Sequence, residues 1–313
     1  MHNTPVDPDV IALFAELGSP SSPVAAADLT AEELRRTMRE SIAIFTRGTE
    51  PIPVHRVTDE FVQGRGGKIP VRLYHPETPT SVMVYLHGGA WITGDIDTHD
   101  PVTRRLSRDT GALVVSVDYR MLPEHPFPAP FDDAYDAVVW ARSLHPGLPL
   151  LVAGDSAGGT LSACVALRAR DVDGPRVDGQ VLVYPGIDDN LDAAGTHACS
   201  HCSDDSIEDL RFFLDQYGSH EAAAGSPYAL PGRATSLAGL PAAVIAIAGH
   251  DLLGSSEKEY ARRLQDDGVP VTVQFDPELV HSWIDFAPRV PAADRAFTRL
   301  TDAVNDLVRR LSA

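Results

Sequence analysis

A serine flanked by glycines, at the junction of an apolar run and a helix-like stretch, constrains this chain more than any other feature. The run at 148–153 leads into GDSAGG at 154–159, which contains the pattern G-x-S-x-G. In this context the pattern predicts a sharp strand-turn-helix that exposes the hydroxyl of Ser156 above a sheet. Gly154 and Gly158 are expected because side chains there would collide with the adjoining strand and helix. The free N–H groups that begin such a helix favour an oxyanion, so Ser156 is the candidate nucleophile.

Apolar runs alternate with helical patterns along most of the remaining chain. The expected strands are residues 54–62, 69–75, 82–86, 112–117, 150–153, 180–184, 243–248 and 271–275. The first two form an antiparallel hairpin, since the glycine-rich stretch at 64–67 is not followed by the helix that a phosphate-binding loop requires. The intervening helices predict an α/β fold with an eight-stranded, mostly parallel sheet covered on both faces. Active sites of such sheets lie beyond the carboxyl ends of the strands.

The first 48 residues read as two helices ahead of the sheet. Thr30 and Glu33 have the spacing of a capping box at the start of the second helix. Two packed surface helices and a lid over a site fit this pattern equally well. We therefore expect N-terminal cap helices at 1–48 and a catalytic domain at 49–313, with a cap-like insertion at about 189–232.

Charge and cysteine content limit the compartment and the partners. The formal net charge of −18 disfavours nucleic acid and anionic membrane surfaces. The N-terminus lacks the pattern of a signal peptide, and no stretch reaches the roughly 18 apolar residues of a membrane span. Three cysteines, an odd and low number, indicate reduced thiols. We expect a cytoplasmic protein without a membrane span.

A second glycine turn follows the third expected strand, at His87-Gly88-Gly89-Ala90-Trp91. Two glycines allow backbone N–H groups to face a bound carbonyl without interference from a Cβ. An ordinary strand-to-helix turn is the alternative, although both glycine turns fall on the same edge of the expected sheet.

These two motifs, together with DYR at 118–120, PEHPFP at 123–128 and YP at 184–185, resemble one known family. The chain is similar to the hormone-sensitive-lipase-like (bacterial family IV) carboxylesterases of the α/β-hydrolase superfamily. The resemblance implies the α/β-hydrolase fold with a small helical cap and Ser156 as nucleophile. It also implies an oxyanion hole formed by the N–H groups of Gly88, Gly89 and Ala157. Ala90 replaces the third glycine of the family's usual HGGG.

A serine nucleophile needs a histidine base and a carboxylate that orients it. In the family order of serine, acid and histidine, Asp251 follows the seventh expected strand and His281 the eighth. Asp188, after the sixth strand, is the main rival for the acid. The weaker candidates are His250, which should point elsewhere, His87, for which a structural hydrogen bond is expected, and Asp155, which is expected to anchor the serine turn.

Trp91 and Trp283 are the expected substrate-binding residues, because each adjoins a candidate catalytic motif. His197, Cys199, His201 and Cys202 include zinc-ligand types, but a single short run without a second ligand pair indicates a polar loop. We therefore expect neither a metal nor an organic cofactor.

The function that these features favour is hydrolysis of short-chain carboxylic esters through an acyl-enzyme. The small expected cap and Trp91 beside Ala90 favour short acyl groups. One alternative is an amidase, formamidase or carbamate hydrolase with the same triad, and another is a small-molecule receptor on the same scaffold. The expected partner is a small-molecule ester, and homodimer formation is left open.

Overall fold

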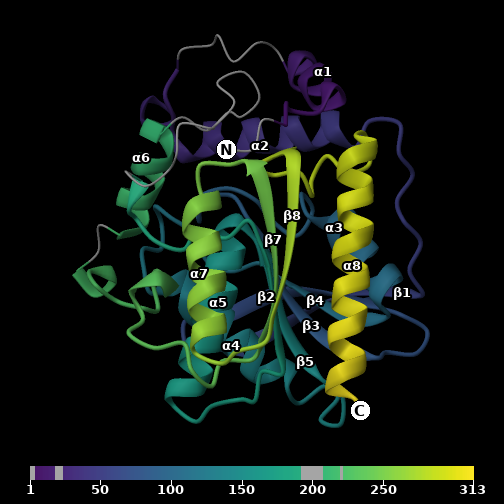
Figure 1. Ribbon diagram of the computed structural model, residues 1–313, viewed down its shortest axis with the longest axis vertical. Helices are drawn as coiled ribbons and strands as arrows, with labels where there is room; N and C mark the ends of the chain where they lie inside the picture. Colours follow the sequence, from purple (N-terminus) through teal and green to yellow (C-terminus); the bar gives the residue numbers. More distant parts are fainter. Residues whose placement is uncertain (1–3, 18–23, 192–206, 219–220) are drawn as a thin grey trace.

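The computed structural model describes residues 4–17, 24–191, 207–218 and 221–313, and a single eight-stranded sheet lies at its centre (Figure 1). The strands are β1 (Arg56–Gly64), β2 (Gly67–His75), β3 (Ser81–Leu86), β4 (Ala112–Val117), β5 (Leu150–Asp155), β6 (Gly179–Val183), β7 (Ala242–His250) and β8 (Val271–Val280). Their order is β1-β2-β4-β3-β5-β6-β7-β8. The β1–β2 and β2–β4 pairs are antiparallel, and all later pairs are parallel. The predicted α/β fold with a leading hairpin is confirmed.

Helices cover both faces of this sheet (Figure 1). One face carries α4 (Ala129–Ala141), α5 (Ser156–Asp171) and α7 (Gly254–Asp266), and the other carries α3 (Asp100–Thr110) and α8 (Pro291–Leu311). Within the described ranges, no helix is both long and apolar enough to cross a bilayer.

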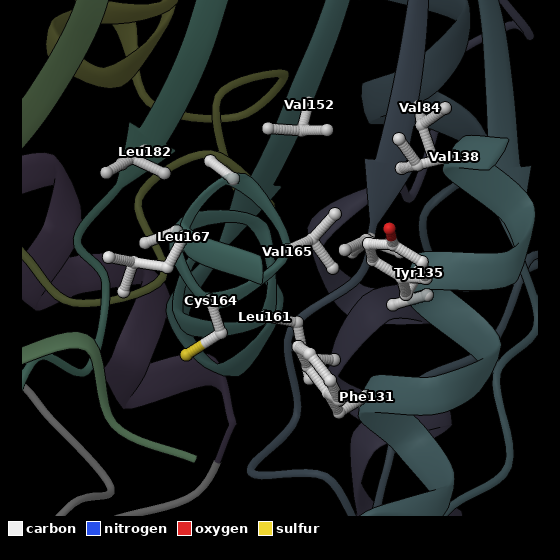
Figure 2. Packing of buried hydrophobic residues seen from close by; sticks show 14 of the residues in the cluster. Val84, Phe131, Tyr135, Val138, Val152, Leu161, Cys164, Val165, Leu167 and Leu182 are labelled. Carbon is white, nitrogen blue, oxygen red and sulfur yellow. The ribbon is translucent and has the colours of Figure 1, made fainter. Parts of the chain in front are cut away.

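The layer between the sheet and α5 fixes the start of that helix (Figure 2). Val152 of β5 and Leu182 of β6 face Val165 and Leu167 of α5, and all four side chains are fully buried. Burying an aliphatic side chain of this size contributes about 1.5–3 kcal/mol. Because several such contacts hold α5 against the strands, the residue that begins the helix is fixed relative to β5.

Three further helices lie together across the end of the sheet where β7 and β8 terminate (Figure 1). We call α1 (Pro8–Glu16), α2 (Ala31–Phe45) and α6 (Ile207–Gly218) the cap. Thr30 and Glu33 form the predicted capping box at the start of α2. A carboxylate oxygen of Asp209 in α6 accepts the N–H of Ala26 at 2.7 Å, which joins the insertion to the N-terminal segment. The domain boundaries at residue 48 and at 189–232 stay predictions.

Strand register determines which loops meet at this end of the sheet. Leu86 of β3 pairs with Gly154 of β5, so the two glycine turns that follow these strands are neighbours. His250 of β7 pairs with Val280 of β8, so the next residue on each strand is brought side by side as well. Four loops that are distant in sequence therefore converge.

Candidate active site

Ser156 lies at the junction of β5 and α5, on a turn that only small neighbours permit. Its backbone φ is +48°, in the left-handed region that L-residues avoid. A Cβ on Gly158 would lie 1.9 Å from the carbonyl oxygen of Leu86, and one on Gly154 would lie 2.5 Å from the same oxygen. The collisions expected from the sequence are therefore present, and they explain both glycines.

His281 and Asp251 extend from the ends of β8 and β7 toward this serine. The imidazole Nε2 lies 2.9 Å from Ser156 Oγ, and Nδ1 lies 2.6 Å from Asp251 Oδ2. The other carboxylate oxygen of Asp251 accepts the N–H of Leu253 at 2.8 Å, which fixes the carboxylate plane. The His281 side chain is 13% exposed and that of Asp251 only 2%. The structure thus joins three predicted residues in one chain of short contacts.

The rival residues make other contacts. Asp188 accepts the N–H of Asn190 at 3.0 Å. Nε2 of His250 faces the carbonyl oxygen of Thr4 at 3.0 Å, and Nδ1 of His87 donates to the carbonyl oxygen of Gly88 at 2.8 Å. Burial lowers the pKa of His87 to about 4, so this imidazole is neutral. His250 and His87 thus point away from the serine, as expected.

The glycine turn after β3 corrects one expectation about the oxyanion hole. The N–H of Gly88 donates to Asp155 Oδ1 at 3.0 Å, so it is not available to a substrate oxygen. The next residues, Gly89, Ala90 and Trp91, all have positive φ values of 110°, 53° and 61°. Successive backbone N–H groups in a turn can line a concavity that binds an anion. The sequence motif locates the turn, but the orientation of the Asp155 carboxylate decides which N–H stays free.

The two tryptophans differ from each other in their surroundings. The Trp283 side chain is fully buried and packs edge-on against Tyr184 and Phe297, within the core on the α3–α8 face. It cannot contact a substrate there, so the expectation of a binding role for Trp283 is wrong. Trp91, 3% exposed, stacks face to face on Tyr217 of α6, with 3.9 Å between ring centroids. Trp91 therefore connects the glycine turn with the cap.

Two residues that were not among the predicted site residues also contact the site. The ring of Tyr184, which follows β6, lies 4.6 Å from the His281 ring and restricts its rotation. Arg35 of α2 donates to the carbonyl oxygens of Ile92 and Leu122 at 2.8 Å and forms a paired contact with Glu124. The YP motif could have indicated Tyr184, whereas nothing in the sequence identifies Arg35 as a cap anchor.

Asp155 anchors the serine turn, as expected, and belongs to a buried polar cluster. Its Oδ1 also accepts the hydroxyl of Tyr85 at 2.5 Å. His99, Asp155 and Asp285 are, among the described residues, the one group of metal-ligating types that converges closely. His197, Cys199, His201 and Cys202 lie outside the described residues.

Comparison with known proteins agrees with this geometry. A family model described as the alpha/beta hydrolase fold matches residues 83–285. The esterase LipI of Mycobacterium tuberculosis is 40% identical over 79% of this chain and 82% of its own length, and the ethyl acetate hydrolase of Pseudomonas putida is 30% identical over 88% and 90%. An esterase structure from the archaeon Pyrobaculum calidifontis superimposes with a TM-score of 0.87 at 33% identity, covering 97% of this chain and 99% of that one. The chain therefore belongs to the hormone-sensitive-lipase-like group of carboxylesterases in the α/β-hydrolase superfamily.

Proposed function

We propose that this chain hydrolyses short-chain carboxylic esters through an acyl-enzyme formed on Ser156. That the chain is a carboxylesterase follows from its relatives, since those compared above are named as esterases or as an ester hydrolase. The observation that carries the assignment of the site is the continuous contact Ser156–His281–Asp251, with distances of 2.9 and 2.6 Å.

Each residue of this contact has a role that its geometry permits. His281 Nε2 takes the proton from Ser156 Oγ as that oxygen attacks the ester carbonyl carbon. Asp251, which accepts from Nδ1–H, fixes the tautomer and stabilises the imidazolium. The imidazolium then protonates the departing alcohol, and the neutral imidazole activates the water that releases the acid. No step requires a metal or an organic cofactor.

Backbone N–H groups would stabilise the negative oxygen of both tetrahedral intermediates. We assign this role to Gly89, to Ala157 in the first turn of α5, and to Ala90, whose left-handed conformation continues the turn. Gly88 is excluded because its N–H is bonded to Asp155.

The preference for short acyl groups is supported by the cap. The Trp91–Tyr217 stack places two large rings beside the glycine turn, and in this proposal these rings limit the length of the acyl group. The name of the Pseudomonas putida relative also specifies a small ester. Trp91 is the proposed substrate-contacting residue. A cytoplasmic location and a homodimer stay predictions.

Two other functions were open from the sequence, namely amide or carbamate hydrolysis with the same triad and ligand binding without turnover. The names of the relatives favour neither. The short Ser156–His281 contact also argues against a receptor, because ligand binding alone does not require a base beside a serine.

The decisive experiment combines active-site labelling with a substrate panel. A fluorophosphonate probe should label the wild type on the peptide that contains Ser156, and Ser156→Ala should lose both labelling and turnover while keeping its circular dichroism spectrum. Among p-nitrophenyl esters of two to sixteen acyl carbons, kcat/KM should be largest at the short end. Labelling elsewhere, a maximum at long chains, or faster hydrolysis of matched amides would each contradict the corresponding part of the proposal.

A further inference from the structure

Three buried ionisable side chains meet beside the serine turn, and the proposed mechanism uses none of them. His99, which precedes α3, is fully buried, and Asp155 and Asp285 are 3% and 6% exposed. His99 Nε2 lies 3.6 Å from Asp155 Oδ2 and 3.9 Å from Asp285 Oδ1. These separations are too long for direct hydrogen bonds but fit ion pairs.

The charges of this cluster are set by mutual contacts. Burial alone would lower the pKa of His99, but the neighbouring Asp155 and Asp285 carboxyl groups outweigh it and raise that pKa to about 9. Burial would likewise raise the pKa of Asp155, yet His99 and the Tyr85 hydroxyl hold it below its usual value. The pKa of Asp285 is raised to about 7, chiefly by burial. At neutral pH an imidazolium on His99 therefore faces a carboxylate on Asp155.

Asp155 connects His99 to both the serine turn and the glycine turn. It is the covalent neighbour of Ser156, and its Oδ1 accepts the N–H of Gly88 at 3.0 Å. A Cβ on Gly88 would lie only 2.2 Å from Asp155 Oδ2, which shows how closely the carboxylate and the glycine turn approach each other. The position of Gly88 in turn determines where the N–H of Gly89 points.

We propose that His99 is a positioning residue whose buried imidazolium keeps Asp155 in the carboxylate form that holds the glycine turn against the serine turn. The proposal rests on the ester hydrolysis proposed above. Without His99, the buried Asp155 carboxylate would have no positively charged partner. That state is strongly unfavourable, so Asp155 would take up a proton or move. Either change would displace the oxyanion donors. Because these donors act mainly in the transition state, the loss should appear in kcat more than in KM.

A divalent cation is the alternative occupant of this cluster. One imidazole and two carboxylates form an acceptable donor set, but a protonated Nε2 has no lone pair for a metal. All three side chains are buried, whereas a metal needs an entry path. A protonated His99 and a metal bound to His99 Nε2 exclude each other, so one measurement distinguishes the two.

The groups that face His99 come from several elements. Thr98 Oγ1 lies 3.0 Å from its Nδ1, and the His87 and Tyr85 rings lie 5.4 and 6.2 Å from its own ring. With Asp155 and Asp285, these groups and Asp95 complete the polar surroundings. Asp285, with its pKa raised to about 7 by burial, is the neighbour whose charge changes near neutral pH.

The first test compares His99→Gln with Asp285→Asn under the same conditions. His99→Gln should lower kcat by about 10–100-fold at pH 7 and change KM by less than about threefold, as expected for partial loss of oxyanion stabilisation. The wild-type kcat should fall as pH rises through 9. Asp285→Asn should keep kcat at pH 7 within about threefold of wild type but move this alkaline limb to lower pH, because one carboxyl that raises the His99 pKa is gone. Wild-type kcat and an unchanged alkaline limb in His99→Gln would overturn the proposal.

The second test uses the wild-type protein alone, so it does not depend on whether a variant folds. In the wild type, the His99 imidazole resonances should titrate with a midpoint near 9, and a midpoint below 6.5 or a stoichiometric bound metal would refute the imidazolium. Because the folded pKa is raised, the stabilisation from His99 is complete below pH 6.5 and is lost as pH passes 9. If wild-type protein neither hydrolyses esters nor accepts the probe, the proposed function fails, while this titration still reports on the ion pair.

Discussion

At Ser156 the backbone conformation costs free energy that the rest of the fold must offset. A left-handed φ at a non-glycine residue costs on the order of 1–3 kcal/mol. The residue keeps that conformation because β5 and α5 are packed on either side of it. The strained turn directs Oγ toward His281 Nε2, which is the contact on which the chemistry depends.

Asp251→Asn and Asp188→Asn form a matched pair of variants at this scale. Asparagine keeps the shape of Asp251 but favours the wrong tautomer of His281, so we expect kcat to fall by on the order of 10²–10⁴. Asp188→Asn should cost much less, since its carboxylate accepts a loop N–H instead. Steady-state kcat of both purified variants decides the matter. If Asp188→Asn had a greatly reduced kcat and Asp251→Asn had a nearly normal one, Asp188 would be the triad acid instead.

The sequence predicts which residues belong to the site more reliably than it predicts where their side chains and N–H groups point. The candidate triad follows from position at strand ends, because parallel strands bring their carboxyl ends to one edge. Which glycine donates to a substrate depends instead on the direction of the Asp155 carboxylate. Trp283 follows His281 by two residues, yet its ring turns into the core. Local sequence carries no signal for either orientation.

Among the elements, α2 is attached to the catalytic domain by the side chain of Arg35 as well as by its buried residues Ile42 and Phe45. Arg35 reaches the carbonyl oxygens of Ile92 and Leu122 as well as Glu124, and Ile92 directly follows Trp91. These contacts fix the cap beside the glycine turn. The pairing with Arg35 also lowers the pKa of Glu124 to about 2, so the carboxylate partner stays ionised in moderately acidic solution.

We expect Arg35→Ala to loosen this attachment without removing any reacting group. Two carbonyl contacts and an ion pair are lost, each hydrogen bond being worth about 0.5–1.5 kcal/mol, or up to about 3 kcal/mol to a charged group. KM for short esters should rise several-fold, by about 3–10, with a smaller change in kcat. Arg36→Ala is the matched control, because Arg36 forms an exposed pair with Glu40 on the same helix. Equal KM values in the two variants would show that Arg35 does not position the cap.

The elements themselves were largely predictable because their signals are local. Every expected strand is present, with ends that differ by a few residues, since buried apolar runs and glycine turns mark them. The capping box at Thr30 also formed as expected. The position of the cap was not predictable, because it depends on contacts such as Arg35–Glu124 between segments 89 residues apart.

For the whole molecule, the strand order distributes the site unevenly across the sheet. Ser156 follows β5, which has neighbours on both sides, whereas His281 follows β8, which lies at an edge and pairs only with β7. Val273 of β8 is 44% exposed, consistent with that edge position. The nucleophile therefore follows a central strand of the sheet, whereas the base follows an edge strand.

One consequence concerns the cooperativity of unfolding. An edge strand can open locally at a lower free energy than the central strands, and that opening would carry the base away from an intact nucleophile. We expect heat to abolish turnover several degrees below the midpoint of the far-UV circular dichroism transition, and amide hydrogens of β8 to exchange before those of β5. Coincident activity and dichroism curves would show that the sheet opens as a single unit. If the two transitions separate, enzyme inactivated by mild heat keeps most of its fold and should regain activity on cooling without complete refolding.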